Sequence, residues 1–578
     1  MHPTEKRALQ NGISPSYTDA FGSRHSVSTK TLEKILDALG DLSQTRSSIS
    51  DEAIAAVSAF QGEASAPERM WIIGVQLYAV RSGHNWGHGD FGDLSALVDI
   101  AAQHGAAGIG LNPLHALFAD RPEDASPYSP NSRLFLNPLY IDLESVPELD
   151  RLARPADLER LRATKQVDYT GIAAAKYAAL REAFAVFRSQ RDPARRQEFD
   201  AFQARCGEPL ARFSAFETLR RLHGNDWRAW PAEWRIPDPE QLARLRETHR
   251  DEMEFVEYAQ WLADAQLAAC RDKARRLGLP IGLYLDVAVG VSPAGADAWT
   301  DQANMLTGLS VGAPPDLLNT AGQNWGLTTY NPVALEAADF DPFRRMLAAS
   351  MRYAGAIRLD HVLGLNRIYL VPEGLPAGEG AYLSYPLQKM LAVVAEESRR
   401  HRSIVIGEDL GTVPETLRAT LAEWGIWSYR VMLFERSEEG DFRTPADYPR
   451  NALVCFSTHD LPTFSGWRSG HDLEVKKALG LDPGENAMER AASLKAMKMA
   501  LGSMADIDYP AAVRFLAETP SRLLSIPVED ILGLREQTNL PGTVSEHPNW
   551  RHRMPIPLEE FGRHPELQRI AAIAGRRS

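Results

Sequence analysis

The chain has 578 residues, of which 44% are hydrophobic and 24% charged, and its net charge is -13. These totals are typical of a globular protein with several domains or of one barrel with insertions. The acidic balance argues against nucleic acid or an anionic membrane as a partner.

The cysteine content and the N-terminal sequence predict a cytoplasmic protein. Cys206, Cys270 and Cys455 lie far apart, and no CxxC or His/Cys cluster suggests a zinc site. No cofactor is predicted. The first 30 residues lack an apolar signal region, and no run of 18 apolar residues occurs. The sequence therefore predicts no membrane span.

Residues 1–67 are predicted to form a small helical segment and a linker. Apolar residues at helical spacing predict a helix over 31–39, with Ser28 or Thr29 as its cap. Residues 41–67 are rich in Ser, Ala and Glu and predict a linker with one short helix over 51–60. The main body of the protein is expected over 68–578.

Eight short apolar runs alternate with segments of helical periodicity, which predicts an α/β fold, a (β/α)8 TIM barrel. Continuous apolar runs are typical of strands buried on both faces. The expected strands lie at 71–80, 106–111, 281–289, 354–359, 404–407, 429–434, 453–456 and 528–532. Between the second and third, residues 144–278 show 3.6-residue periodicity and predict a mainly helical insertion.

Two further features point to a functional site. Asp286 lies inside an apolar strand, where a carboxylate is costly unless it is paired. Residues 290–332 are predicted to form a long loop that contains Gln323 and Trp325. Loops of this length in compact proteins are usually functional or disordered, and the rigid prolines of this one favour a functional loop.

Three carboxylates follow three of the expected strands. Asp360 ends the fourth in the string I-R-L-D-H, and Glu408 and Asp460 follow the fifth and seventh. Arg358 and Asp360 would project to the same face of a strand, and a nearby guanidinium favours an ionised carboxylate. Chemistry in such barrels occurs at the carboxyl ends of the strands. The pattern therefore predicts a reactive site with Asp360 kept ionised.

Two chemistries fit three carboxylates. A divalent metal could be bound by them together with His361 and His459. The other is glycoside chemistry, which uses a carboxylate nucleophile and a carboxylic acid. The positive charge of Arg358 disfavours a metal at Asp360, and aromatic and amide side chains in the loops favour a sugar chain. These loop residues are Tyr128, Gln323, Trp325 and Asn539.

Several longer strings carry a resemblance to a known family. They are G-V-Q-L-Y (74–78), N-W-G-H-G-D-F-G-D-L (85–94), S-P-Y-S-P (126–130), G-A-P-P-D (312–316), G-Q-N-W-G (322–326), I-R-L-D-H (357–361), I-G-E-D-L-G-T-V-P (406–414), T-H-D-L-P-T (458–463), N-L-P-G-T (539–543) and N-W-R (549–551). With these strings in this order, the chain resembles the 4-alpha-glucanotransferases (amylomaltases) of glycoside hydrolase family 77. The resemblance runs from about residue 71 to about residue 557.

The resemblance implies roles for the carboxylates and a class of substrate. Asp360 takes the position of the nucleophile, Glu408 that of the acid/base, and Asp460 that of the carboxylate that stabilises the transition state. The substrates would be maltooligosaccharides and α-1,4-glucans. A retaining double displacement further predicts that the carboxyls of Asp360 and Glu408 lie about 5 to 5.5 Å apart.

The resemblance also implies binding residues. His361 and His459 would hold hydroxyls of the reacting glucose together with Asp460, and Arg358 would keep Asp360 ionised. The donor and acceptor subsites would be lined by Ser126, Tyr128, Asp286, Gln323, Trp325 and Asn539.

One departure from the family pattern occurs in the G-A-P-P-D loop, which continues with Leu317 and Leu318 where some members have aromatic residues. Stacking of an acceptor sugar is not expected there. Two alternative functions remain open: an α-amylase-like retaining hydrolase on the same barrel, and a glucan-binding protein without catalysis.

Overall fold

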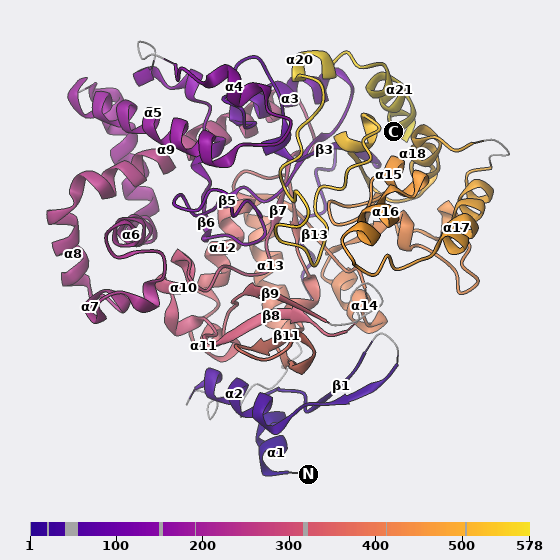
Figure 1. Cartoon of the computed structure of the whole chain (residues 1–578), viewed down its shortest axis with the longest axis horizontal. Coiled ribbons are helices and arrows are strands. Elements are labelled where there is room, and N and C mark those ends of the chain that lie inside the picture. The colour runs from indigo at the N-terminus through magenta and orange to yellow at the C-terminus, as the bar shows by residue number, and fades with distance from the viewer. Residues whose placement is uncertain are drawn as a thin grey trace.

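The structure is a computed structural model that describes residues 2–19, 22–40, 56–149, 154–190, 192–315, 322–411, 413–502 and 506–577. At its centre, eight strands form a closed barrel in which every pair of neighbours is parallel (Figure 1). The strands are β3 (Met70–Val75), β4 (Gly108–Leu111), β7 (Gly282–Val287), β10 (Ala356–Leu359), β13 (Ile404–Gly407), β14 (Trp427–Val431), β15 (Ala452–Cys455) and β16 (Leu523–Pro527). They follow one another in chain order, which confirms the predicted (β/α)8 barrel.

The eighth strand lies earlier in the chain than predicted. β16 ends at Pro527, and Val528–Ile531 forms the short helix α19, so the strand expected over 528–532 is wrong. Pro527 is extended and precedes the first turn of the helix. Val528 and Ile531 are three residues apart and both buried, which one helical face allows. The span predicted as the eighth strand is therefore helical, and the barrel strand directly precedes it.

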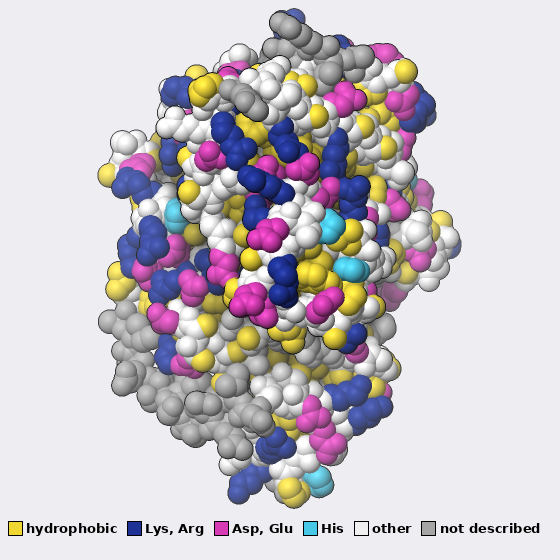
Figure 2. Space-filling view, turned by 90° about the vertical axis from the view of Figure 1, so that its left-hand side faces the viewer, with side chains coloured by type: hydrophobic (Ala, Val, Ile, Leu, Met, Phe, Trp, Pro, Cys, Tyr) yellow, Lys and Arg dark blue, Asp and Glu magenta, His cyan; other side chains and the backbone are white. Residues whose placement is uncertain are grey.

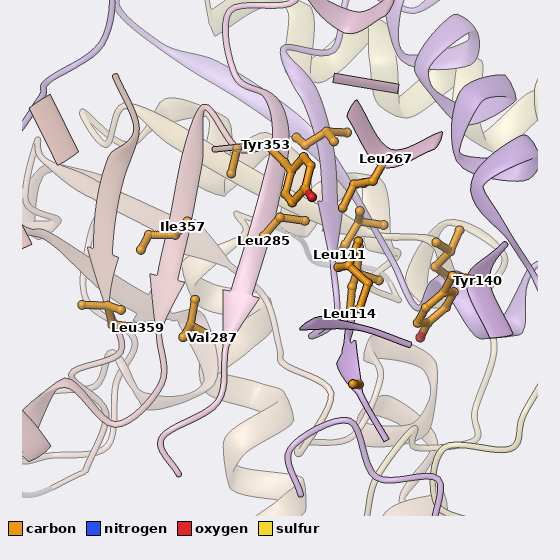
Figure 3. Packing of buried hydrophobic residues seen from close by; sticks show 14 of the residues in the cluster. Leu111, Leu114, Tyr140, Leu267, Leu285, Val287, Tyr353, Ile357 and Leu359 are labelled. Atoms are coloured by element: carbon orange, nitrogen blue, oxygen red, sulfur yellow. The ribbon is translucent and has the colours of Figure 1, made fainter. Parts of the chain in front are cut away.

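Alternation along the strands divides the buried residues into two layers. Leu285, Ile357 and Leu359 belong to the larger cluster between barrel and helices, where Figure 3 shows them on neighbouring strands. Tyr284 and Ala356, one position away, belong to the smaller cluster inside the barrel. By the same alternation, Asp286 and Arg358 project into the barrel interior, and this fixes the site at its centre.

Helices cover the outside of the barrel. Those between successive barrel strands include α3 (Phe91–Gln103), α9 (Arg250–Arg276), α12 (Asp341–Met351), α13 (Leu387–His401), α14 (Glu415–Glu423) and α18 (Tyr509–Glu518). None of the helices within the described ranges is long and apolar enough to cross a lipid bilayer.

The segment between β4 and β7 is mainly helical, as predicted for 144–278. It contains α4 (Leu158–Ala163), α5 (Tyr169–Gln190), α6 (Pro193–His223), α7 (Ala232–Arg235), α8 (Pro239–Thr248) and α9, which leads back into β7. Gly207, in the left-handed region at φ 56°, kinks α6 shortly before Pro209. Figure 2 shows the side of the molecule on which these helices lie, with acidic and basic side chains interspersed over it.

A second sheet corrects the prediction of one long loop over 290–332. Its strand order is β12-β11-β8-β9, formed by β8 (Leu309–Ala313), β9 (Gln323–Leu327), β11 (Arg367–Pro372) and β12 (Ala381–Ser384). Gly312 allows β8 and β9 to approach closely, because a Cβ there would lie 2.1 Å from the Gln323 carbonyl oxygen. Gly312, which suggested a loop in the sequence, therefore serves a close strand pair.

The N-terminal segment consists of α1 (Pro3–Gln10), β1 (Ser16–Thr18), β2 (Arg24–Ser26) and α2 (Thr29–Leu39). The predicted helix and its Ser28 cap are confirmed, since the Ser28 side chain accepts a hydrogen bond from the Thr31 amide. The β1–β2 hairpin was not predicted. Of the short helix expected over 51–60, residues 51–55 lie outside the described residues and 56–60 are not helical.

Aromatic packing joins this segment to the second sheet. The ring of Tyr17 makes edge contacts with Tyr369 and Tyr382, at centroid distances of 5.5 and 6.1 Å. Ile13 pairs with Leu383 next to them. The division of the chain into a segment 1–67 and a barrel region 68–578 stays a prediction.

Candidate active site

One guanidinium joins two of the predicted carboxylates. β7 and β10 run parallel with Asp286 and Arg358 in register. Arg358 Nη1 donates to both carboxylate oxygens of Asp286, at 2.9 Å each, and Nη2 lies 2.9 Å from Asp360 Oδ1. The predicted Arg358–Asp360 pair is therefore present, and the buried Asp286 has the partner that its position requires.

Burial has a larger effect on Asp360 than the sequence suggested. Removal from water raises the pKa of Asp360 to about 6, because the lowering by Arg358 does not offset burial and the nearby charges of Asp286 and Glu408. Arg358 thus lowers this pKa, but not to the usual value of an aspartate. At pH 7 the ionised form still predominates.

Glu408 lies against the backbone that follows Asp360. Its Oε2 accepts a hydrogen bond from the His361 amide at 2.9 Å, and its Oε1 accepts one from the Leu410 amide at 2.8 Å. His361 has a left-handed backbone, at φ 48°. Burial raises the pKa of Glu408, and this favours a carboxyl that can carry a proton near neutral pH.

Asp460 is held differently. Asn539 Nδ2 donates to its Oδ1 at 2.6 Å, and His459 Nε2 lies 3.3 Å from its Oδ2. Burial acts to raise the pKa of Asp460, but the His459 imidazole and the Asn539 amide outweigh it, so that this pKa lies below its usual value. The site therefore contains two carboxyls with raised pKa and one that stays ionised.

Stacked rings form one wall of the site. The Tyr128 hydroxyl donates to Asp286 Oδ2 at 2.5 Å, and the Tyr128 ring stacks on that of His459, with centroids 4.8 Å apart. Trp550 packs against both rings, at 5.5 and 5.3 Å. Trp550 was not predicted as a site residue, although it lies in the N-W-R string that carried the resemblance.

The second sheet brings Trp325 to the other side of the site. Trp325 Nε1 donates to Gln323 Oε1 at 3.1 Å, and both residues lie on β9. The Trp325 ring meets that of His361 edge to face at 5.3 Å, directly beside Asp360. The second sheet thus brings residues that precede Asp360 by 35 and 37 positions in the sequence to the site.

Ser126 lies in the Tyr128 loop, where its carbonyl accepts the Ser129 amide at 3.2 Å. No described contact joins its side chain to the carboxylates. Leu317 and Leu318 lie outside the described residues. The other predicted site residues form one connected set, namely Tyr128, Asp286, Gln323, Trp325, Arg358, Asp360, His361, Glu408, His459, Asp460 and Asn539.

A cavity of about 90 Å³ opens below this set, lined by Tyr128, Asp286, Arg358 and His459 among others. A buried carboxylate bound by an arginine and a second carboxyl whose pKa burial raises, with aromatic walls, fit the arrangement that glycoside chemistry requires. On a (β/α)8 barrel, it defines the class of carbohydrate-active barrel enzymes.

Comparison with known proteins gives the family. Residues 75–558 match the family model described as 4-alpha-glucanotransferase. The 4-alpha-glucanotransferase of Haemophilus influenzae is 37% identical over 544 residues, which cover 87% of this chain and 78% of that protein. That of Mycobacterium tuberculosis strain H37Rv is 38% identical over 518 residues, covering 84% and 71%. The chain therefore belongs to the 4-alpha-glucanotransferase family and is an enzyme of this glucan-transferring class.

Solved structures agree with this assignment. The crystal structure of amylomaltase from Corynebacterium glutamicum superposes with a TM-score of 0.83 at 26% identity, covering 99% of each chain. The amylomaltase from Streptococcus agalactiae, solved in complex with acarbose, has a TM-score of 0.74 at 20% identity and covers 88% of this chain and 99% of its own. At that identity, the second structure supports the fold alone.

Proposed function

We propose that this enzyme transfers α-1,4-glucan segments between maltooligosaccharides by a retaining double displacement, with a covalent glycosyl–aspartate intermediate on Asp360. The observation that carries the proposal is the pairing of Asp360, bound by Arg358, with Glu408, whose pKa burial raises. One carboxyl is available as an anion and the other as an acid in the same site.

In the first step, Asp360 attacks the anomeric carbon and the bond from this carbon to the glycosidic oxygen breaks. Glu408 gives its proton to that oxygen, so that the acceptor-side glucan leaves as a neutral alcohol. In the second step, Glu408 takes the proton of an incoming 4-hydroxyl as this oxygen displaces Asp360. Two inversions at one carbon retain the α configuration, and both carboxyls return to their starting state.

The remaining residues act on the reacting glucose. Asp460 stays ionised beside His459 and accepts hydrogen bonds from sugar hydroxyls as positive charge develops at the anomeric carbon, and the His361 imidazole binds a hydroxyl of the same glucose. Tyr128 and Asp286 support this wall, while Gln323, Trp325 and Asn539 bind neighbouring sugars. Ser126 is assigned to the same subsites through its place in the Tyr128 loop.

Incubation of the pure protein with maltotriose tests the proposal against its two alternatives. The products are separated by chromatography at successive times. The expected result is a ladder of longer maltodextrins together with free glucose. Glucose and maltose alone, with reducing ends rising in step, would establish an α-amylase-like hydrolase instead. Unchanged maltotriose would favour a glucan-binding protein without catalysis.

The same assay tests the role of Asp360 and the metal alternative. Asp360→Asn should lower the rate by about 10³-fold or more, since the nucleophile is removed. Wild-type activity should survive a strong chelator, because the reaction as proposed involves no metal. Loss of activity in the chelator at a temperature well below the Tm of the chelated protein, with recovery on adding back a divalent ion, would overturn this proposal.

We also propose a cytoplasmic location. Cys206, Cys270 and Cys455 are all free thiols, which suits a reducing compartment. Cell fractionation tests this directly, with co-sedimentation in the membrane fraction as the contrary result.

A further inference from the structure

The glycine-rich string 85–94 has no part in the reaction described above, yet it builds a polar cluster of its own. His84, Asp90 and Asp93 lie between the end of β3 and the first turn of α3. Asp142 joins them from the N-terminus of the 3-10 turn η4 (Leu143–Ser145). The fold thus brings one imidazole and three carboxylates together from positions 84 to 142.

Three of these four groups lie close enough to one another to share one ion. Single ligand atoms of His84, Asp90 and Asp142 all lie within 4.8 Å of one another. His84 Nε2 is 3.7 Å from Asp90 Oδ1 and 3.4 Å from Asp93 Oδ1. Two ligands of a tetrahedral Zn²⁺ ion, each about 2.1 Å from the metal, are separated by about 3.4 Å.

Two of the atoms that face each other have no hydrogen bond within the described residues, His84 Nε2 and Asp93 Oδ1. The Asp93 side chain is fully buried, at 0% exposed. Its other oxygen accepts hydrogen bonds from Asn85 Nδ2 at 2.8 Å and from the Asp90 amide at 3.0 Å. These bonds fix the carboxylate, and they leave Oδ1 directed at His84.

Gly92 keeps the space between the ligands open. A Cβ at this position would lie 2.6 Å from Asp142 Oδ2 and 2.9 Å from His84 Nε2. No other residue could occupy this position without displacing the Asp142 carboxylate or the His84 ring. The glycine therefore marks the centre of the cluster.

The charges of the cluster leave room for a dication. Lys176 Nζ, which lies 3.8 Å from Asp90 Oδ2, is the basic group that faces the acids from α5. It also donates to the carbonyls of Leu139 and Ile141 at 2.7 and 2.8 Å. The neighbouring Asp90 and Asp93 raise the pKa of His84 to about 9, so its imidazole is protonated at neutral pH without an ion, and the five groups sum to -1. A divalent cation that displaces this proton brings the sum to zero, whereas a net charge is costly inside the protein.

We propose that His84, Asp90, Asp93 and Asp142 bind one divalent transition-metal ion of the Zn²⁺ type. The imidazole selects against Ca²⁺ and Mg²⁺, which prefer oxygen ligands alone. The ion would tie the loop after β3 and the start of α3 to the chain that leads into the helical insertion. It lies outside the catalytic set, so its role is structural and independent of the transfer reaction.

Equilibrium dialysis with Co²⁺ tests the site, after removal of endogenous metal with a chelator. One Co²⁺ per chain should bind, with a visible d–d absorption band that Zn²⁺ abolishes by displacement and Mg²⁺ does not. Saturating Zn²⁺ at about 100 times its Kd should also raise the Tm by about 2 °C. Elemental analysis of the protein before chelation should find the same stoichiometry.

His84→Ala is the informative variant, since the His84 side chain is 37% exposed and its loss does not open the core. It should weaken Co²⁺ binding at least tenfold and remove the Tm shift. His223→Ala, which removes an exposed histidine outside the cluster, should leave both unchanged. Wild-type protein that binds no stoichiometric Co²⁺, or His84→Ala protein that binds it equally well, would overturn the proposal in favour of a simple ion pair between His84 and the acids.

Discussion

Two opposing effects act on the pKa of the Asp360 carboxyl. Its burial in the barrel mouth disfavours the charge, while Arg358 favours it, and burial is the larger effect. The sequence showed the arginine two residues away but not the degree of burial. The ionised form of Asp360 therefore lowers the free energy of unfolding, and this effect can be measured.

Asp360→Asn should therefore stabilise the protein while it abolishes catalysis. The folded pKa of about 6 lies above the value of 3.8 for an unperturbed aspartate. The penalty for ionising Asp360 in the fold is thus absent below about pH 4 and complete above about pH 6 to 7. We expect the free energy of unfolding to rise by on the order of 2 kcal/mol at pH 8.

Urea unfolding of the wild type and the variant at pH 8 and at pH 4.5 measures this, and the gain should shrink at the lower pH. Asp99→Asn serves as the control. Asp99, on α3, is half-exposed and pairs with Lys273 on α9, so its loss should change stability by less than about 0.5 kcal/mol. A destabilised Asp360→Asn protein at pH 8 would show that the Arg358 pair outweighs the cost of burial.

The pH dependence of transfer should follow the same pair of carboxyls. The kcat/KM value should rise with pH through about 6 as Asp360 loses its proton, and fall at higher pH as Glu408 loses the proton that it must donate. Arg358 lowers the pKa of Asp360 in part, so Arg358→Met should move the acid limb to higher pH. Arg358→Lys, which keeps the charge, should move it less.

Residual activities of both variants across pH 4.5 to 9 give the limb positions even where the rates are low. An acid limb that stays in place in Arg358→Met would mean that Asp360 is not the group titrating there. The two carboxyls interact, so each limb reports the pair.

At the scale of residues, the sequence was informative where a functional group ends a strand. Asp360, Glu408 and Asp460 could be identified because each follows a buried run on a barrel. Trp550 could not, since its position against Tyr128 and His459 depends on a left-handed turn, at φ 59°, far along the chain. The sequence around Trp550 gives no indication of its role apart from the N-W-R string that resembles the family.

Among the elements, the sequence predicted barrel strands better than it predicted the strands around the site. Continuous apolar runs identified seven of the eight barrel strands, whereas β9 alternates exposed and half-buried residues. In β8, Gly312 is required because the backbone of β9 approaches it closely, whereas glycine in a sequence suggests a turn. The eighth strand was misplaced because one apolar run crosses from β16 into α19.

Gly89, in the loop between β3 and α3, shows what such close approach costs. A Cβ on Gly89 would lie 1.9 Å from the Leu77 carbonyl oxygen, which is backbone and cannot rotate away. Gly89→Ala should therefore lower the free energy of unfolding by about 3 kcal/mol. Gly83→Ala, in the same loop, is the matched control, since its nearest atom is a Glu559 side-chain oxygen at 3.5 Å.

The urea unfolding midpoints of Gly89→Ala and Gly83→Ala show whether a steric clash or the loss of loop flexibility causes the destabilisation. If both alanines cost the same, chain flexibility rather than the approach to Leu77 would explain the glycines of this loop.

Over the whole molecule, the helical insertion and the barrel meet at the loop that carries Tyr128. Asn131, fully buried in that loop, donates through Nδ2 to Glu217 Oε1 on α6 at 2.6 Å. Its Oδ1 accepts the Ala296 amide from the chain after β7 at 2.7 Å. One side chain thus ties the insertion, the loop and the barrel together, three residues from a ring in the active site.

Asn131→Ala should therefore affect catalysis as well as stability. It leaves the Glu217 carboxyl and the Ala296 amide without their partner, at a cost of about 1 to 3 kcal/mol, and it frees the loop that positions Tyr128. We expect kcat with maltotriose to fall about tenfold, because small misplacement of a positioned ring is costly for the reacting geometry. Glu217→Gln keeps an acceptor for the Asn131 amide and should retain near wild-type kcat. If Asn131→Ala lowers the Tm but leaves kcat unchanged, the insertion only stabilises the fold, and Tyr128 is positioned from the barrel side through Asp286 and His459.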